Sequence, residues 1–254
     1  MYTTLINAAG AAAHGGAEYG LVPMLRDGNA VTWTTFIVLL VMFTGSLYIL
    51  FTKLFEQNKV MRQGRDMQAT FWRAPSLDDG MKKLEKNSAY RQIVEDGLRA
   101  QSDHSKLANP VEAHDWMHGT MERSQNHINS KLNSGLSFLA TVGSTAPFVG
   151  LFGTVIGILT ALVKIGASGQ ASIDAVAGPV GEALIMTAIG LVVAVPAVMA
   201  FNWLQGRNKV IGRNLSTFSN DVLGSIMSNG AVRPSVAAAA PAAPAKPAAA
   251  PAKA

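Results

Sequence analysis

Glu182 carries a carboxylate at the N-terminal end of a long apolar stretch, and this position indicates a role in binding or transferring ions or protons. The 22 residues from Ala183 to Leu204 carry only two polar side chains, Thr187 and Asn202. A run of about 20 apolar residues at about 1.5 Å each crosses a bilayer core of about 30 Å. Inserting an ionisable group there costs roughly 2.5–3.5 kcal/mol. We therefore expect Glu182 to handle ions or protons, or to hold subunits together.

A second interpretation of Glu182 stays open. Gly178 and Pro179 could mark the start of the helix, because proline is favoured at the first helical position. The carboxylate would then lie at the outer membrane interface and reach water. It would have no role in transport.

Two threonines could line a polar path with Glu182. Thr154 lies in the sequence Gly-Thr-Val-Ile-Gly that begins at Gly153, and Thr187 follows Glu182 by five residues. A threonine in a membrane helix can instead bond its own backbone at the preceding turn, so a structural role also stays open. Because these spans hold few other polar groups, Thr154 and Thr187 are candidates for lining a pathway.

Small residues recur on both apolar stretches and predict close helix packing. They let membrane helices approach without a hydrophobic driving force between them. We expect Pro147 and Pro196 to kink their helices, because proline frees a backbone carbonyl. The expected packing positions are Gly150, Gly153 and Gly157, with Gly143 in the same series, and a stripe of Ala183, Thr187, Gly190, Ala194 and Ala197.

Composition also favours a membrane protein over an enzyme or a nucleic-acid-binding protein. Charged residues make up 15% of the chain, against about 25% in soluble domains. The chain has no cysteine, which excludes disulfides and thiolate metal sites. Basic residues flank apolar runs rather than forming a patch with aromatic residues. No nucleophile–base pair is recognisable, so we expect no catalysis and no cofactor.

His114 and His118 have the spacing of a helical zinc pair. A third ligand is not recognisable, and Asp115 stands where metalloproteases carry glutamate. We therefore interpret the pair as part of a solvated helix face and predict no metal site.

The predicted fold class is an all-α membrane protein with three transmembrane helices per subunit and long helices that extend into a cytoplasmic helical domain. The predicted segments are a periplasmic head at 1–30, a first transmembrane helix at 31–52, a cytoplasmic helical domain at 53–131, a second transmembrane helix at 132–165, a periplasmic link at 166–175, a third transmembrane helix at 176–204, a cytoplasmic C-terminal helix at 205–230 and a disordered Ala/Pro-rich tail at 231–254.

Local signals predict where the cytoplasmic helices begin. Ser76 should cap a helix over 77–86, Ser88 should start another, and Asn109-Pro110 a third. The apolar periodicity after Pro110 continues into the second span, so we predict that this helix either tilts in the membrane or extends out of it as one long rod. We also expect the third span to continue past Trp203 as a basic amphipathic helix.

Basic residues predict the orientation in the membrane. The head holds one Lys or Arg, the link none, the middle domain 13 and the C-terminal segment six. Because Lys and Arg accumulate on the cytoplasmic side, the N-terminus should be periplasmic and the C-terminus cytoplasmic.

Two paired motifs resemble the ExbB/TolQ/MotA family. They are Ala-Pro-Phe-Val-Gly-Leu-Phe-Gly-Thr-Val-Ile-Gly-Ile at 146–158 and Gly-Glu-Ala-Leu-Ile-Met-Thr-Ala-Ile-Gly-Leu at 181–191. The match favours the ExbB branch, which belongs to the TonB system of the bacterial inner membrane. The family's transmembrane glutamate falls on Glu182, and its two pathway threonines fall on Thr154 and Thr187.

The resemblance implies a pentamer around a pore that holds the single-span partner ExbD. Proton flow would drive motion passed to TonB, which opens outer-membrane transporters for siderophores, vitamin B12 or haem. The partner's aspartate would be the main proton carrier, and Glu182 would set the pore's electrostatics. The residues themselves also indicate a homo-oligomer, because two packed helices with one charge do not enclose a channel.

Two alternatives stay open. A TolQ-type subunit is the same machine serving envelope integrity, and membrane motifs separate the two poorly. A passive membrane scaffold would use Glu182 only to bond a neighbouring helix. A flagellar stator subunit is less well supported, because that branch has four spans and this chain has three predicted ones.

Overall fold

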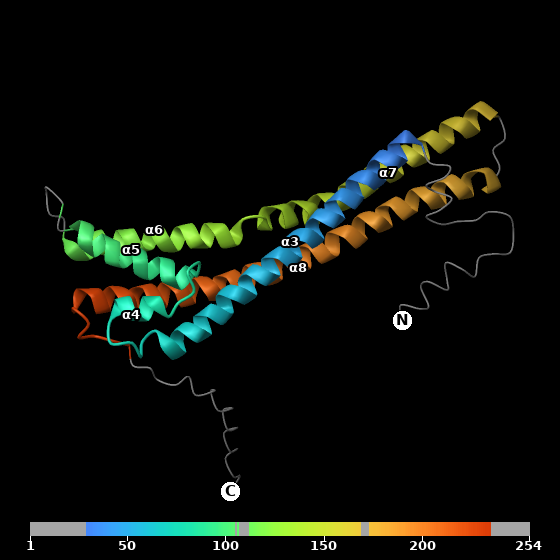
Figure 1. Ribbon diagram of the computed structural model, residues 1–254. Coiled ribbons are helices and arrows are strands. Elements are labelled where there is room, and N and C mark those ends of the chain that lie inside the picture. The colour runs from blue at the N-terminus through green and yellow to red at the C-terminus, as the bar shows by residue number, and fades with distance from the viewer. Residues whose placement is uncertain (1–28, 105, 107–111, 169–172, 235–254) are drawn as a thin grey trace, which may run out of the picture. The chain divides into compact units, whose positions relative to one another are not determined.

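The computed structural model describes residues 29–104, 106, 112–168 and 173–234, and all regular structure in these ranges is helical. The all-α prediction is confirmed. The chain divides into two compact units, a first unit with residues 1–58 and 129–211 and a second unit with residues 59–128 and 212–254. The helices, shown in Figure 1, are α3 (Ala30–Thr70), α4 (Leu77–Lys82), α5 (Ala89–His104), α6 (Ala113–Asn133), α7 (Leu136–Ser168) and α8 (Ile173–Met227).

Three stretches are long and apolar enough to cross a membrane, as predicted. They are α3, the combined stretch of α6 and α7 from Ala113 to Ala167, and the part of α8 from Val180 to Met227. α8 runs without interruption to Met227, so the predicted continuation past Trp203 is confirmed. Residues 169–172, within the predicted link, lie outside the described residues, as do residues 1–28 and 235–254 of the head and tail.

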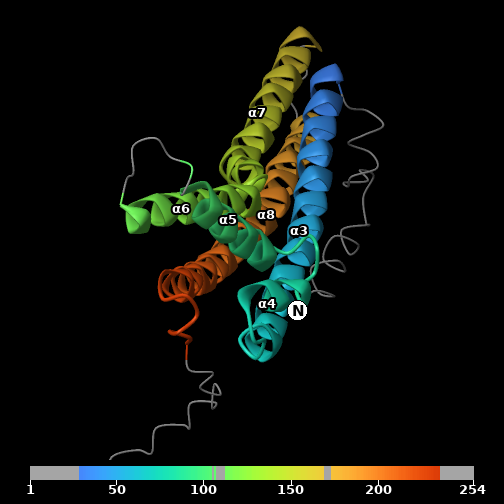
Figure 2. The ribbon, with the colours of Figure 1, turned by 60° about the vertical axis from the view of Figure 1, so that its left-hand side comes forward.

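In the first unit, α3, α7 and α8 pack side by side (Figure 2). Small and medium apolar side chains fill the space between them, because the helices approach closely only where side chains are small. Large apolar side chains such as Phe148 and Val192, 70% and 64% exposed, point outward. The central cluster consists of Leu39, Val142, Ala146, Val193, Ala194 and Ala197.

The predicted long rod is wrong at one point, because α6 ends at Asn133 and α7 begins at Leu136. Gly135 adopts φ 82°, a left-handed conformation that glycine tolerates best. Lys53 of α3, 9% exposed, donates from Nζ to the Lys131 carbonyl at 2.9 Å and to Ser134 Oγ at 3.0 Å. The Lys131 carbonyl also accepts from Ser134 Oγ at 2.7 Å, so these bonds tie the end of α6 to α3.

A buried polar cluster joins three helices beside this break. Gln57, with none of its surface exposed, donates from Nε2 to the Leu204 carbonyl at 2.9 Å and to Asn208 Oδ1 at 2.7 Å. Asn208 Nδ2 donates in turn to the Leu132 carbonyl at 3.0 Å and to Asn133 Oδ1 at 2.9 Å. Because buried polar groups are costly to leave unpaired, this cluster fixes the register of α3, α8 and the end of α6.

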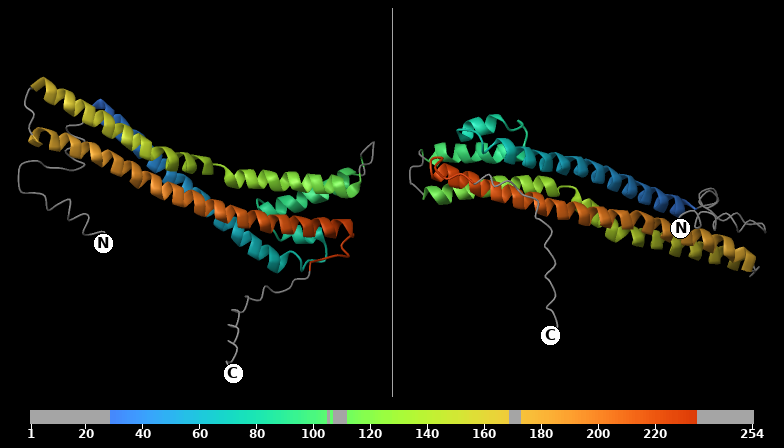
Figure 3. Two further views of the ribbon diagram at one scale, coloured as in Figure 1. Left: turned by 180° about the vertical axis from the view of Figure 1, so that it is seen from behind. Right: turned by 90° about the horizontal axis from the view of Figure 1, so that it is seen from below.

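The second unit is a small helical domain with an aromatic core. The rings of Phe71, Trp72, Tyr90 and Phe218 meet edge to face, with centroids 4.9–6.0 Å apart. α5 packs beside the first part of α6 (Figure 3), where Trp116 Nε1 donates to the Ala100 carbonyl at 3.0 Å. The predicted amphipathic face of α8 is confirmed, since Leu215, Phe218, Val222 and Leu223 are buried.

Two of the three predicted helix starts are confirmed. Ser76 Oγ accepts from the Asp79 N–H at 3.1 Å, and Ser88 Oγ accepts from the Arg91 N–H at 3.0 Å. The helix after Ser76 ends at Lys82 instead of residue 86. Asn109 and Pro110 lie outside the described residues.

Candidate functional site

The site is built on a seam where α7 and α8 are almost in backbone contact. A methyl group placed on Gly150 would lie 2.7 Å from the Met186 carbonyl oxygen and 3.2 Å from the Gly190 Cα. A methyl group on Gly190 would lie 2.7 Å from the Ala146 carbonyl oxygen. Real Cβ atoms do not come that close to backbone oxygen, so a larger side chain at either position requires the helices to move apart.

Two further glycines of α7 lie against neighbouring helices. A methyl group on Gly157 would lie 3.2 Å from Ala183 Cβ on α8. One on Gly153 would lie 3.0 Å from Thr35 Cγ2 on α3 and 3.4 Å from Met186 Cβ. The glycine series of α7 therefore meets both α8 and α3.

Thr154 lies inside the seam and is 4% exposed. Its hydroxyl donates to the Leu151 carbonyl at 2.7 Å, the backbone bond that a structural role predicts. Gly157 faces Ala183, and Gly150 faces Thr187. Because Thr154 is one turn from each of these glycines, it lies opposite the turn of α8 between Ala183 and Thr187.

Thr187 and Glu182 lie on α8 at this same level. Thr187 Cα would be 3.2 Å from a methyl group on Gly150, and its half-buried hydroxyl makes no hydrogen bond to another described residue. Glu182 is half-buried and adjoins Ala183 in the sequence. It is separated from Thr187 by about 7.5 Å along the helix axis, at about 1.5 Å per residue. The structure thus gathers the predicted carboxylate and hydroxyls within about two turns.

The two prolines lie inside continuous helices. Pro147 is in the interior of α7, one turn before Gly150. Pro196 lies within α8. Each removes one N–H from its helix and frees the carbonyl four residues earlier. Both helices nevertheless run on past their proline, and a kink at either residue stays a prediction.

Thr35 is a seam residue that the sequence analysis missed. It is 4% exposed on α3, and its hydroxyl donates to the Val31 carbonyl at 2.8 Å. Its methyl group packs against Gly153. The available signal was a hydroxyl-bearing residue in an apolar span, but nothing in the sequence showed that α3 meets α7 there.

The histidine pair lies on an exposed part of α6. The His114 and His118 rings stack with centroids 5.9 Å apart. His114 Nδ1 lies 3.2 Å from Asp115 Oδ1, and both side chains are more than half exposed. Within the described residues, no group of three His, Cys, Asp or Glu side chains could hold a metal ion.

Comparison with known proteins identifies the family to which this chain belongs. A model of the MotA/TolQ/ExbB proton channel family matches residues 85–217, which is over half of the chain and includes Thr154, Glu182 and Thr187. The chain belongs to this family. The resemblance predicted from the paired motifs is confirmed, and the protein is a member of a transport family rather than of an enzyme family.

Individual relatives extend the similarity over most of the chain. The chain is 40% identical over 203 residues to the biopolymer transport protein ExbB of Xanthomonas campestris pv. campestris, covering 76% of this chain and 80% of the relative. It is 32% identical to ExbB of Neisseria gonorrhoeae, covering 78% and 93%. It is also 30% identical to the Tol-Pal system protein TolQ of Haemophilus influenzae, covering 81% and 92%.

Proposed function

We propose that the chain is the multi-span subunit of an inner-membrane proton channel and motor of ExbB type. The motor uses the proton-motive force to energise outer-membrane uptake of siderophores, vitamin B12 or haem. Its partners are an ExbD-type single-span protein and a TonB-type transducer. The N-terminus is periplasmic, and the C-terminus is cytoplasmic.

The observation that supports this proposal is the placement of one carboxylate and two hydroxyls within about two helical turns of one another along the α7–α8 seam, in a chain of a proton channel family. An ionisable residue within a membrane span is costly and marks an ion or proton path by default. Glu182 supplies the charge, and Thr154 and Thr187 supply exchangeable hydroxyl protons. In this scheme Glu182 sets the field that a proton on the partner's carboxylate experiences.

The packing of the first unit supports a homo-oligomer, which we propose to be a pentamer. The two helices approach at Gly150 and Gly190 too closely for water to pass between them there, so the described helices of one chain enclose no channel at that level. Several copies can enclose one, with the Glu182 side of α8 facing the lumen. The outward-facing apolar side chains then contact lipid and neighbouring copies, among them Phe148, Leu151, Phe152, Leu191 and Val195.

The ExbB assignment is favoured over TolQ by two relatives that each match over three quarters of the chain or more, since the Xanthomonas ExbB is 40% identical and the Haemophilus TolQ 30% identical. A TolQ-type role in envelope integrity is the second candidate, since that relative is covered over 92% of its length. In a passive scaffold, loss of the Glu182 charge would change assembly and leave proton-dependent work intact.

Complementation separates these functions. We expect the wild-type gene, expressed in a strain that lacks its own ExbB, to restore growth on a ferric siderophore as sole iron source. In a strain that lacks TolQ, it should not restore survival in bile salts. Immunoblots of membranes from the two strains check that the chain is expressed in each. Rescue of bile-salt survival alone would contradict the ExbB assignment and support the TolQ one.

A further inference from the structure

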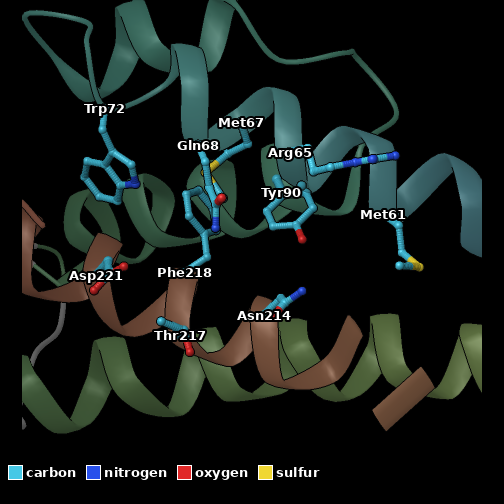
Figure 4. A pocket seen from close by; sticks show the side chains of 11 residues that line it. Met61, Arg65, Met67, Gln68, Trp72, Tyr90, Asn214, Thr217, Phe218 and Asp221 are labelled. Carbon is cyan, nitrogen blue, oxygen red and sulfur yellow. The ribbon is translucent and has the colours of Figure 1, made fainter. Parts of the chain in front are cut away.

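The second unit contains a groove that the proton path does not use. It has a volume of about 350 Å³ and is open to solvent along one side. Figure 4 shows its two walls, with Met61, Arg65 and Gln68 on the α3 side and Asn214, Thr217 and Asp221 on the α8 side, and Tyr90 between them. A volume of roughly 300–1,000 Å³ is typical of ligand sites.

Polar groups converge on this groove that have no hydrogen-bond or ion-pair partner among the residues that the structure describes. The Tyr90 side chain belongs to a residue that is 2% exposed, yet its hydroxyl bonds no described residue. Neither Arg65 nor Asp221 forms an ion pair within the described residues. Another arginine of this unit, Arg91, does have a carboxylate partner, Glu95, at 2.6 Å. Burial raises the pKa of Asp221, because it disfavours the charged form of the carboxyl group. A hydroxyl without a protein partner and an unpaired carboxylate, both lining a solvent-open groove, are groups that an incoming ligand could bind.

Aromatic rings form the apolar part of the groove. Trp72 lies at the Asp221 end, and Phe218 lies between Trp72 and Tyr90 and meets both rings edge to face (Figure 4). Gly64 is required beside Tyr90, because a methyl group there would overlap the tyrosine hydroxyl. Aromatic grooves with an acidic residue at one end bind proline-rich peptides in several protein modules, since such peptides lose little entropy on binding.

The chain carries such a segment close by. Residues 235–254 contain only Ser, Val, Ala, Pro and Lys, and include Pro241-Ala-Ala-Pro244-Ala-Lys246. This hexapeptide has two prolines three positions apart, followed by a cation. Residues 235–254 contain two lysines and no acidic residue, so the segment complements the free carboxylate of Asp221.

The start of the tail is held at the Trp72 end of the groove. Arg233 donates from Nη1 to the Ala74 carbonyl at 2.8 Å and from Nη2 to the Pro75 carbonyl. Ala74 follows Trp72 by two residues. The seven residue steps from Pro234 to Pro241 span up to about 23 Å when extended, which is enough to bring Pro241 back over the groove.

We propose that Pro241–Lys246 docks in this groove of its own chain, with its prolines on the aromatic rings and Lys246 beside Asp221. Arg65 carries the same charge as Lys246, so it excludes the opposite orientation. The amide side chains of Gln68 and Asn214 then face the peptide backbone, whose N–H and C=O groups they can satisfy. This docking is independent of the proton-motor proposal.

Disulfide trapping in the full-length protein tests the docking, because the chain has no cysteine. Thr217→Cys is combined with Ala245→Cys, and the control combines Ala245→Cys with Asn126→Cys on the exposed face of α6. Membranes are oxidised mildly and the remaining thiols are counted with a polyethylene-glycol maleimide. We expect the Thr217 pair to form a disulfide within one chain and the control pair to remain reduced.

Charge reversal provides the second arm of the experiment. Asp221→Lys should lower the disulfide yield by about fivefold, the effect of a partly buried ion pair, and Lys246→Glu in the same chain should restore it. Equal yields for the Thr217 and Asn126 pairs would overturn the proposal. A covalent dimer on a non-reducing gel would also overturn it, since a neighbouring chain's tail would then fill the groove. Restoration by the second substitution shows that Asp221→Lys has not unfolded the unit.

Discussion

Gly150→Val is expected to prevent α7 and α8 from packing and to leave little folded protein in the membrane. A Cβ at this position would lie 2.7 Å from a backbone oxygen of α8, which no side-chain rearrangement can relieve. Overpacking of a tight core costs typically 1–3 kcal/mol, and a clash with backbone belongs at the upper end of that range, about 3 kcal/mol or more. The yield of protein that stays monodisperse in mild detergent measures the effect.

A matched control position lies on α8, the helix that forms the other side of the seam. Gly206 has no atom within 4 Å of the position that a Cβ would take, so Gly206→Val should leave the yield and the melting temperature close to wild type. Both substitutions add the same isopropyl group to a helical glycine, and only the surroundings differ. If Gly150→Val folded as well as Gly206→Val, the close α7–α8 seam would be contradicted.

Glu182→Gln is expected to abolish most energised uptake while leaving the protein assembled. Glutamine keeps the size of the side chain and removes its charge, and its amide has one acceptor oxygen and an NH2 donor in place of two acceptor oxygens. Because a single-sign field in a low-dielectric site changes local ion concentration by roughly 10–10³-fold, uptake of a radiolabelled ferric siderophore should fall about tenfold or more. Glu182→Asp, which keeps the charge, should retain a larger share of the wild-type rate.

Assembly is the control for this substitution. Native mass spectrometry of the purified complex should give the same subunit count for wild type and Glu182→Gln. A changed count with normal uptake per assembled complex would favour the scaffold function of Glu182. A normal subunit count together with normal uptake would favour the interpretation of Glu182 as an interfacial carboxylate that has no role in transport.

Much of the fold could be predicted because apolar length and helix caps are local signals. The runs ending near Thr52 and Trp203 predict spanning helices by length alone, and Ser76 predicts a cap from its own side chain. The break at Gly135 was missed because the apolar periodicity continues across it. The residues Asn133-Ser134-Gly135 were a turn signal, but the bond from Lys53, which is distant in sequence, completes the helix end.

The sequence indicated which residues belong to the candidate site, but it did not show how they are arranged. Glu182, Thr154 and Thr187 stand out by type, since polar groups are rare in apolar runs. The pairing of Gly150 with Gly190, and the approach of Thr35 to Gly153, depend on how three helices rotate against one another. The groove around Tyr90 combines α3, α5 and α8, and periodicity within any one helix carries no information about such a combination.

Proton entry into liposomes tests the central claim most directly. The chain is reconstituted with its ExbD-type partner in vesicles loaded with a pH-sensitive dye, and an external acid step is applied at fixed membrane potential. We predict faster internal acidification than in protein-free vesicles, and a rate close to the protein-free baseline with Glu182→Gln. Acidification at the same rate with and without the Glu182 carboxylate would contradict a proton path that depends on it.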